Sequence, residues 1–336
     1  MTKGMEIDLK VRSAYFDNIK GIMIFFVVFC HCVRLLSRSE ETGLLNYLIQ
    51  VVYSFHMPVF VFVSGYFTKK HEEKLIVKYL IPYVVVNTIF GLLSSIIERS
   101  AFGFHAINPF FPNRTLWYLL SIFWWKVFLS HFVELKYSII VVFFLSIFSS
   151  CLSRVDGFLS ISRTIAFFPY FLAGNYLQSK GLMSYIRNYN KYRILILFLI
   201  VETSVIFFTF QGLPRQAFEL SVPAVELGFS FWQGVLFRAY SYIVGTVGIV
   251  FFLVYVPNKL ISLSYLGTRS ITVYLAHYLF LIMINRVINI GTSEVCILIV
   301  SALLTIVICL MFGNDKIFRI YKQMIIFIDK HFSNNS

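Results

Sequence analysis

Apolar stretches that are long enough to cross a lipid bilayer follow one another along almost all of the 336 residues. A transmembrane helix needs about 20 predominantly apolar residues, and a closed helix satisfies its own backbone polar groups inside the hydrocarbon. The predicted spans are 16–36, 46–68, 75–97, 115–133, 136–152, 162–180, 192–210, 236–256, 269–290 and 294–313. The sequence therefore predicts an all-α integral membrane protein, a bundle of about ten transmembrane helices.

Composition agrees with a membrane protein, because 58% of the residues are hydrophobic and only 13% are charged. Residues 1–15 are polar and lack the short apolar core and small-residue cleavage site of a signal peptide. We therefore expect a cytoplasmic N-terminal segment at 1–15, one membrane domain at 16–313 and a basic cytoplasmic tail at 314–336. The five cysteines lie in or beside apolar segments, and we expect no disulfide framework.

The net charge of +13 is spread over short loops between the spans and does not form one patch. This distribution excludes a nucleic-acid partner and is typical of a topology signal. If the N-terminus is inside, 18 Lys and Arg residues fall on the inner side and 9 on the outer side. The bias predicts that both termini are cytoplasmic, in a multi-pass protein of the plasma membrane surrounded by lipids.

The first span carries three ionisable residues, Asp17, Lys20 and His31, which are costly inside a membrane and mark function by default. Lys20 and His31 are eleven positions apart, so they project within about 20° of one another and about 16 Å apart along the helix. Asp17 lies one turn before Lys20 on nearly the same face. We expect this polar stripe to face a cavity or a polar interior.

His31 has a structural and a functional interpretation. A histidine in a helix bundle often only bonds to a neighbouring helix, whereas a neutral imidazole can also take the proton of a hydroxyl group as it attacks an acyl group. Lys20 can likewise snorkel to the membrane surface. Cys30 and Cys32 flank His31 but point about 200° apart on a helix, so we predict no metal site.

Other polar residues in the spans are weaker candidates. His56 precedes Met-Pro in the second span, and Lys74 and Lys78 follow it. The lysines fit ordinary positive-inside charge, or a site for the phosphates of a nucleotide-like donor. Glu202 lies within a later span, where a Lys or Arg partner and a substrate role are both open. His277 lies within another span, where a structural and a functional role are both open. Trp117 fits an aromatic belt or a substrate contact.

The motifs together resemble the membrane-bound acyltransferase type 3 family, in its fucose 4-O-acetylase-like branch. The similar stretches are 17–31 (DNIKGIMIFFVVFCH), 55–66 (FHMPVFVFVSGY), 116–119 (LWYL), 171–174 (FLAG) and 273–277 (VYLAH). In this branch a Lys replaces the Arg of the basic-x10-His pair. The chain departs from many relatives in carrying Lys74 and Lys78 in place of a paired-arginine motif.

This resemblance implies about ten helices and the transfer of an acetyl group from acetyl-CoA to a hydroxyl of a bacterial surface polysaccharide or lipid-linked glycan. His31 then matches the catalytic histidine, as general base or acyl carrier, Lys20 its basic partner, and Asp17 the group that orients Lys20. His56, Trp117, Glu202 and His277 become substrate-contacting candidates, and Lys74 and Lys78 donor-contacting ones. No metal is implied, and polysaccharide synthesis enzymes are the implied partners.

Two other classes of function fit a polar-lined bundle of helices. An exporter of a polysaccharide or a small solute often has repeated, Gly- or Pro-broken segments in its two halves, and none is evident here. A scaffold for a synthase complex would not need Lys20 and His31. Acyl-CoA turnover with candidate glycans separates these classes.

Overall fold

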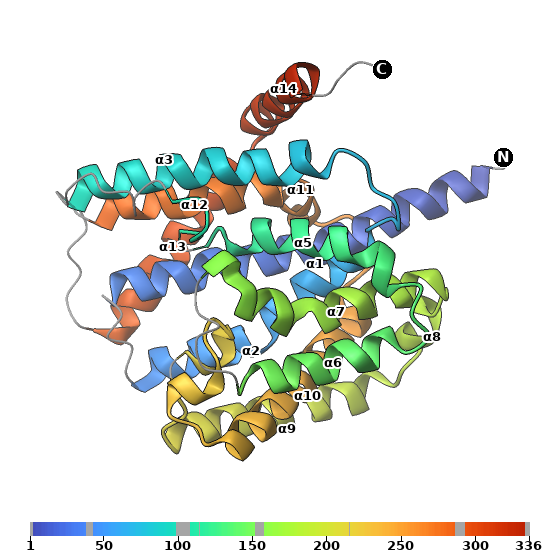
Figure 1. The fold of residues 1–336 in the computed structure, drawn as a ribbon, viewed down its shortest axis with the longest axis vertical. Coiled ribbons are helices and arrows are strands. Elements are labelled where there is room, and N and C mark those ends of the chain that lie inside the picture. The colour runs from blue at the N-terminus through green and yellow to red at the C-terminus, as the bar shows by residue number, and fades with distance from the viewer. Residues whose placement is uncertain are drawn as a thin grey trace. The chain divides into compact units, whose positions relative to one another are not determined.

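The computed structural model describes residues 3–37, 43–98, 108–113, 115–151, 158–214, 216–285 and 293–332. All regular elements within these ranges are helices (Figure 1). The longer helices are α1 (Lys3–Leu36), α2 (Gly43–Tyr66), α3 (Ile81–Glu98), α5 (Trp117–Phe132), α6 (Ser138–Ser149), α7 (Ile161–Ser179), α9 (Lys191–Phe210), α10 (Phe231–Tyr255), α12 (Ser270–Asn285), α13 (Glu294–Phe312) and α14 (Asp315–Phe332). The short ones are α8 (Met183–Arg187), α11 (Ser262–Thr268), the π-helix η1 (Ile76–Leu80) and the 3-10 turns η2 (Phe158–Ser160), η3 (Ala217–Glu219) and η4 (Ala224–Leu227).

The predicted all-α membrane architecture is confirmed, but the count of ten complete spans is not. Six helices in the described part of the chain are long and apolar enough to cross a membrane, and the bent pair α11–α12 makes up to seven. The six are Ala14–Leu36, Gly43–Tyr66, Ile76–Ile96, Lys191–Phe210, Phe231–Tyr255 and Glu294–Phe312. The predicted pair 115–133 and 136–152 forms α5 and α6, of 16 and 12 residues, which are shorter than the roughly 20 residues of a full span.

The predicted span 269–290 begins at the break between α11 and α12, where the chain turns by 81°. Its described part is the single helix α12, and α11 precedes it as a separate short helix that was not predicted. Residues 286–290 of this span lie outside the described residues, as do 1–2 and 333–336 of the two predicted terminal segments. The orientation of the termini stays a prediction.

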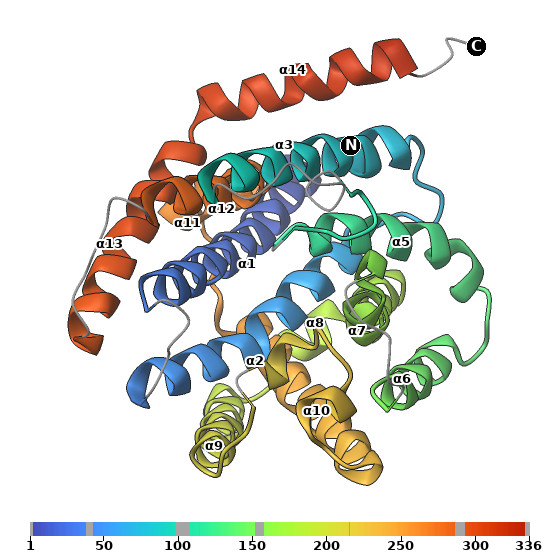
Figure 2. The same ribbon diagram turned by 60° about the vertical axis from the view of Figure 1, so that its left-hand side comes forward.

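Two compact units make up the chain. Unit 1 comprises Met1–Val63, Gly181–Gly212 and Val244–Ile320, and unit 2 comprises Ser64–Lys180, Leu213–Ile243 and Tyr321–Ser336. In unit 1, α11, α12 and α13 pack along α1 (Figure 2). In unit 2, α7 packs against both α5 and α6. Helix α1 is therefore the central element of unit 1, and α7 that of unit 2.

Asparagine side chains cap the starts of two helices, α9 and α14. The Asn190 side chain accepts a hydrogen bond from the Arg193 backbone N–H at 3.1 Å and caps α9. Asn314 does the same for α14, accepting from the Ile317 N–H at 3.0 Å. Asparagine is favoured at this position because its side-chain oxygen replaces a missing backbone partner. Asn314 thus fixes where α14 starts after α13.

Candidate functional site

The polar stripe predicted for the first span is present on α1. Lys20 Nζ lies 2.7 Å from Asp17 Oδ1, one turn apart on the helix. The Asp17 side chain is 11% exposed and that of Lys20 27% exposed, so the pair is partly withdrawn from solvent. The two residues share a face because the spacing i, i+3 places side chains one above the other. The predicted pairing of Asp17 with Lys20 is confirmed as a contact.

The residues between these two anchor α1 against the loop that leads into α11. The Asn18 amide donates to the carbonyls of Pro257 and Lys259, each at 2.9 Å. The Ser264 hydroxyl donates to the Asn18 side-chain oxygen. Asn18 is fully buried, and its three hydrogen bonds satisfy its polar atoms. Sequence analysis did not single out Asn18, which holds the polar stripe in place.

Two glycines let α1 and α11 approach with backbone against backbone. A Cβ added at Gly21 would overlap the carbonyl of Leu263, and one at Gly267 would overlap the carbonyl of Asp17. Neither position has room for a side chain, since the colliding atoms belong to the main chain. Small residues commonly permit such close approach of helices in membranes. The position of α1 relative to α11 is thus tightly fixed.

His31 meets His277 of α12 across unit 1. Their ring centroids are 5.4 Å apart with the planes inclined by 35°. Tyr278 lies edge-on to His31, with centroids 5.5 Å apart. His277 is fully buried. The structure therefore brings together two histidines that the sequence separates widely.

The hydrogen bonds of His277 fix its tautomer. Its Nδ1 lies 2.8 Å from the Tyr274 carbonyl and 3.1 Å from that of Val273. Only a protonated nitrogen bonds to a carbonyl oxygen, so Nδ1 carries the hydrogen and Nε2 of the neutral ring has a free lone pair. Nε2 is buried and has no hydrogen-bond partner in the described part of the chain. This atom can accept a hydrogen bond from a substrate or from a neighbouring N–H group.

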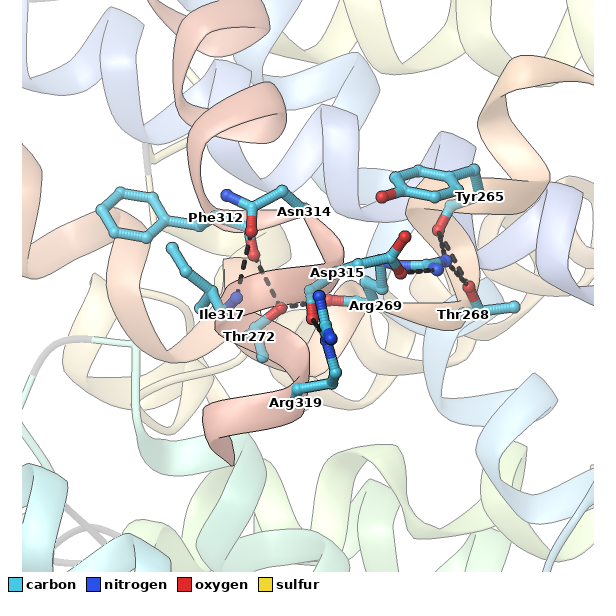
Figure 3. Close-up of polar contacts among 9 residues, drawn as sticks. All are labelled: Tyr265, Thr268, Arg269, Thr272, Phe312, Asn314, Asp315, Ile317 and Arg319. Carbon is cyan, nitrogen blue, oxygen red and sulfur yellow. Dashed lines mark hydrogen bonds and ion pairs between the residues drawn. The ribbon is translucent and has the colours of Figure 1, made fainter. Parts of the chain in front are cut away.

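Arg269 lies at the break between α11 and α12 and its contacts stabilise this bend (Figure 3). Helix α12 carries His277. The Arg269 guanidinium stacks on the Tyr265 ring at 3.6 Å and donates to the Tyr265 carbonyl at 3.0 Å. It also pairs with Asp315 at the start of α14, with Nε 2.9 Å from Oδ1. The hydrogen bond from Arg269 lowers the pKa of Asp315 below its ordinary value. Thr272 donates to the Phe312 carbonyl at 2.8 Å and ties α12 to the end of α13.

Glu202 of α9 and Ser54 of α2 form a second polar contact within unit 1. The Ser54 hydroxyl lies 3.1 and 3.2 Å from the two carboxylate oxygens of Glu202, and both residues are buried. A Lys or Arg partner was one of the two expectations for Glu202, and the hydrogen-bond partner found is a serine. The Ser54–Glu202 contact joins two helices, so no local pattern indicated it.

His56 lies two residues after Ser54 and faces a different set of groups. Its Nδ1 is 2.7 Å from the Val52 carbonyl, and its ring is edge-on to Tyr53 with centroids 4.9 Å apart. His56 is buried. Asp17, Lys20, His31, His56, Glu202 and His277 all belong to unit 1. The remaining candidates, Trp117, Lys74 and Lys78, belong to unit 2.

Trp117 is buried at the start of α5. The Arg163 guanidinium lies 5.0 Å from the centroid of its ring, and the ring of Phe167 is 5.3 Å away. Arg163 Nη2 is in turn 3.3 Å from Glu219 Oε2. The structure thus places Trp117 in a cation–π and ion-pair network inside unit 2.

The two donor-site lysines are held in ion pairs. Lys74 Nζ is 2.8 Å from Asp329 of α14, and Lys78 Nζ is 3.4 Å from Glu72. The buried Lys126 also pairs with Glu72. Burial opposes the ionisation of Glu72, but the hydrogen bond and charge of Lys126, joined by Lys78, outweigh it and lower its pKa. This loop is therefore a compact network of charges.

The backbone around these lysines is unusual. Lys74 has a φ of 60°, which lies in the left-handed region of backbone conformation. This region is energetically unfavourable for any residue other than glycine. The π-helix η1 follows directly and contains Lys78. π-Helical turns are rare and occur often at functional sites. Among the described residues no group of three or more His, Cys, Asp or Glu side chains suits a metal ion, and all five cysteines are free.

Comparison with known proteins finds a family match over most of the chain. A family profile described as an acyltransferase domain matches residues 13–313. The nodulation protein NolL of Sinorhizobium fredii is 39% identical over 56 residues, which cover 16% of this chain and 15% of that protein. The match therefore spans only a small part of the length of this relative. No solved structure matches the chain.

Proposed function

This chain belongs to the acyltransferase 3 family, and we propose that it is an O-acetyltransferase that moves the acetyl group of acetyl-CoA to a hydroxyl group of a surface polysaccharide or lipid-linked glycan. The observation that carries the proposal is the facing pair His31 and His277 on helices that the family match includes. The Asp17–Lys20 ion pair lies on the same helix as His31. Placement in the fucose 4-O-acetylase-like branch stays a prediction.

In the proposed reaction His31 acts as the general base. It takes the proton of the acceptor hydroxyl as the oxygen attacks the thioester carbonyl, the C–O bond forms and the C–S bond breaks. The proton then passes from His31 to the departing thiolate of CoA. The free lone pair of His277 Nε2 accepts a hydrogen bond from the N–H of the His31 ring, which directs the other ring nitrogen of His31 at the acceptor hydroxyl.

Lys20 supplies positive charge for the donor or for the tetrahedral oxyanion. Asp17 orients Lys20, since the ion pair restricts the rotamers of a flexible side chain. Lys20→Arg then keeps part of the activity, whereas Lys20→Met is nearly inactive with an unchanged pH profile, because the titrating base remains. A fully active Lys20→Met protein would show that this lysine is only a membrane-surface anchor.

Lys74 and Lys78 are the proposed contacts for the phosphates of acetyl-CoA. They now bind Asp329 and Glu72, so phosphate groups would replace these carboxylates as partners. Neutralising both lysines should raise the KM for acetyl-CoA. Lys70→Met is the matched control, because Lys70 lies in the same loop and binds the exposed Glu134 at 3.0 Å.

The experiment that tests the function measures CoA release from acetyl-CoA by the purified protein with candidate glycans, for wild type and His31→Ala. We expect transfer with an acceptor present and its loss in His31→Ala, at an unchanged amount of folded membrane protein. Substantial transfer by His31→Ala would contradict the catalytic role. The acceptor would be supplied by polysaccharide synthesis enzymes at a bacterial plasma membrane.

A further inference from the structure

Arg238 is a buried cation that the proposed reaction does not use. It lies at the start of the third turn of α10, within unit 2, and is 2% exposed. Its Nε and Nη1 atoms are sealed from solvent and have no hydrogen-bond partner in the described part of the chain. A guanidinium group remains charged under all ordinary conditions. The fold therefore carries a buried positive charge with open donors.

No neighbour of Arg238 among the described residues neutralises its charge. The ionisable side chains that act on it electrostatically are Tyr242, Tyr170 and Cys151, which are uncharged near neutral pH in their ordinary state. The two tyrosine hydroxyls are engaged elsewhere. Tyr170 donates to the Ser241 carbonyl at 3.0 Å, and Tyr242 donates to the Ala166 carbonyl at 2.7 Å.

Arg163 in the same unit shows what a structural arginine looks like here. Its guanidinium pairs with the Glu219 carboxylate and covers the Trp117 ring. Buried charges in proteins are normally paired in this way, because an isolated one is strongly unfavourable. A water molecule could accept from Arg238 but would not balance its charge. The missing partner of Arg238 is therefore an anion.

We propose that Arg238 binds a carboxylate or phosphate group of the acceptor, so that the enzyme acts on an acidic glycan. The planar guanidinium presents parallel N–H groups that match the two oxygens of such an anion. Hydrogen bonds join the helices around Arg238: Tyr170 and Tyr242 link α7 to α10, and the Ser150 hydroxyl at the end of α6 donates to the Gly234 carbonyl of α10. Only the identification of the anion with the acceptor depends on the proposed function.

The test uses Arg238→Met, which keeps the apolar stem of the side chain and removes the charge. We expect the purified Arg238→Met protein in neutral detergent to melt at the same temperature as wild type or higher, because an unpaired buried charge is removed. Inorganic phosphate or glucuronate, at constant ionic strength, should raise the melting temperature of wild type and not that of Arg238→Met. The KM for an acidic acceptor should rise by roughly tenfold or more, as expected for a charge-assisted hydrogen bond.

Arg163→Met is the matched control. It leaves Glu219 without its arginine, so it should melt below wild type and keep the response to phosphate and glucuronate. A third arm replaces the anions with phosphatidylglycerol in nanodiscs. If only this lipid stabilises wild type, Arg238 binds a headgroup and the acceptor assignment is wrong.

Three other outcomes overturn the site itself. These are an Arg238→Met protein that melts well below wild type, an equal response of wild type and Arg238→Met to the anions, and no response of wild type. None of these measurements requires acetyl transfer. Loss of the His31 role would therefore leave the Arg238 result intact, and the two proposals fail separately.

Discussion

The rings of His31 and His277 face one another with centroids 5.4 Å apart, although they come from the first and one of the last helices of the chain. The Nδ1 atom of His277 is bonded to carbonyls of its own helix, which leaves Nε2 for an external group. The pair therefore offers one nitrogen base and one hydrogen-bond acceptor within one small region of unit 1.

Replacing His277 tests this arrangement. His277→Phe keeps a ring of similar size and removes the Nε2 lone pair, so we expect kcat to fall by on the order of a hundredfold with little change in the KM for acetyl-CoA. Steady-state CoA release measures both constants. Tyr278→Phe is the control, because it keeps the edge-on ring beside His31. An unchanged kcat in His277→Phe would limit this histidine to packing.

The Ser54–Glu202 contact should stabilise unit 1. Ser54→Ala leaves the buried carboxylate without this hydrogen bond, and we expect a loss of about 1–3 kcal/mol in unfolding free energy. Ser179→Ala is the control, because in the part of the chain that the structure describes the Ser179 hydroxyl bonds only to a carbonyl of its own helix. Combining Ser54→Ala with Glu202→Met should recover part of the loss. No recovery would show that Glu202 has another essential partner.

Position 21 should tolerate no side chain larger than that of glycine. Gly21→Ala places a Cβ atom against the Leu263 backbone, so α1 and α11 must separate and the yield of folded protein should fall sharply. Gly234→Ala is the control, because its added Cβ would meet the Ala224 methyl group at 3.1 Å, a far milder contact. Size-exclusion profiles after mild detergent extraction measure the folded fraction. Equal profiles for the two variants would contradict the tight packing.

Because of the Glu72–Lys126 ion pair, we expect the stability of the fold to decrease at acidic pH. The folded-state pKa of Glu72 is lowered, so its contribution is present above the unfolded pKa of about 4.3 and is lost as the pH falls through the lower folded value. Melting curves between pH 7 and pH 3 should show this loss below about pH 4. Glu72→Gln should be less stable at pH 7, because the buried Lys126 loses its counter-charge.

The comparison that decides this prediction is the difference between wild type and Glu72→Gln at each pH. The difference should be largest at neutral pH and should shrink on acidification. Lys70→Met, which disturbs only the exposed pair with Glu134, should follow the wild-type curve. A constant difference across the pH range would show that the carboxylate charge of Glu72 does not stabilise the fold.

The sequence predicted those features that depend on local geometry. The helical spacing of Asp17 and Lys20 was sufficient to predict that they share a face, and the ion pair follows from it. Long apolar runs likewise predicted the helices α2, α9 and α13 nearly to their ends, and the end of α1, although α1 begins at Lys3, well before its predicted span. In each case the information lies within a few turns of one helix.

Features that depend on distant segments were not predictable in this way. No proline or glycine lies at the break between Thr268 and Ser270; Arg269 holds this break through Tyr265 and Asp315. The contact of His31 with His277 and the serine partner of Glu202 were likewise not predictable from local sequence. These contacts join parts of the chain whose pairing follows from the packing of whole helices.

The backbone contacts of Gly21 and Gly267 also make α1 sensitive to insertions. One residue added between Gly21 and His31 would turn the rest of the helix by about 100° and advance it by about 1.5 Å, so His31 would leave His277. The Asp17–Lys20 pair would keep its place, because it precedes Gly21, where α1 is held against α11. Within this stretch a change of chain length is therefore more damaging than most changes of side chain.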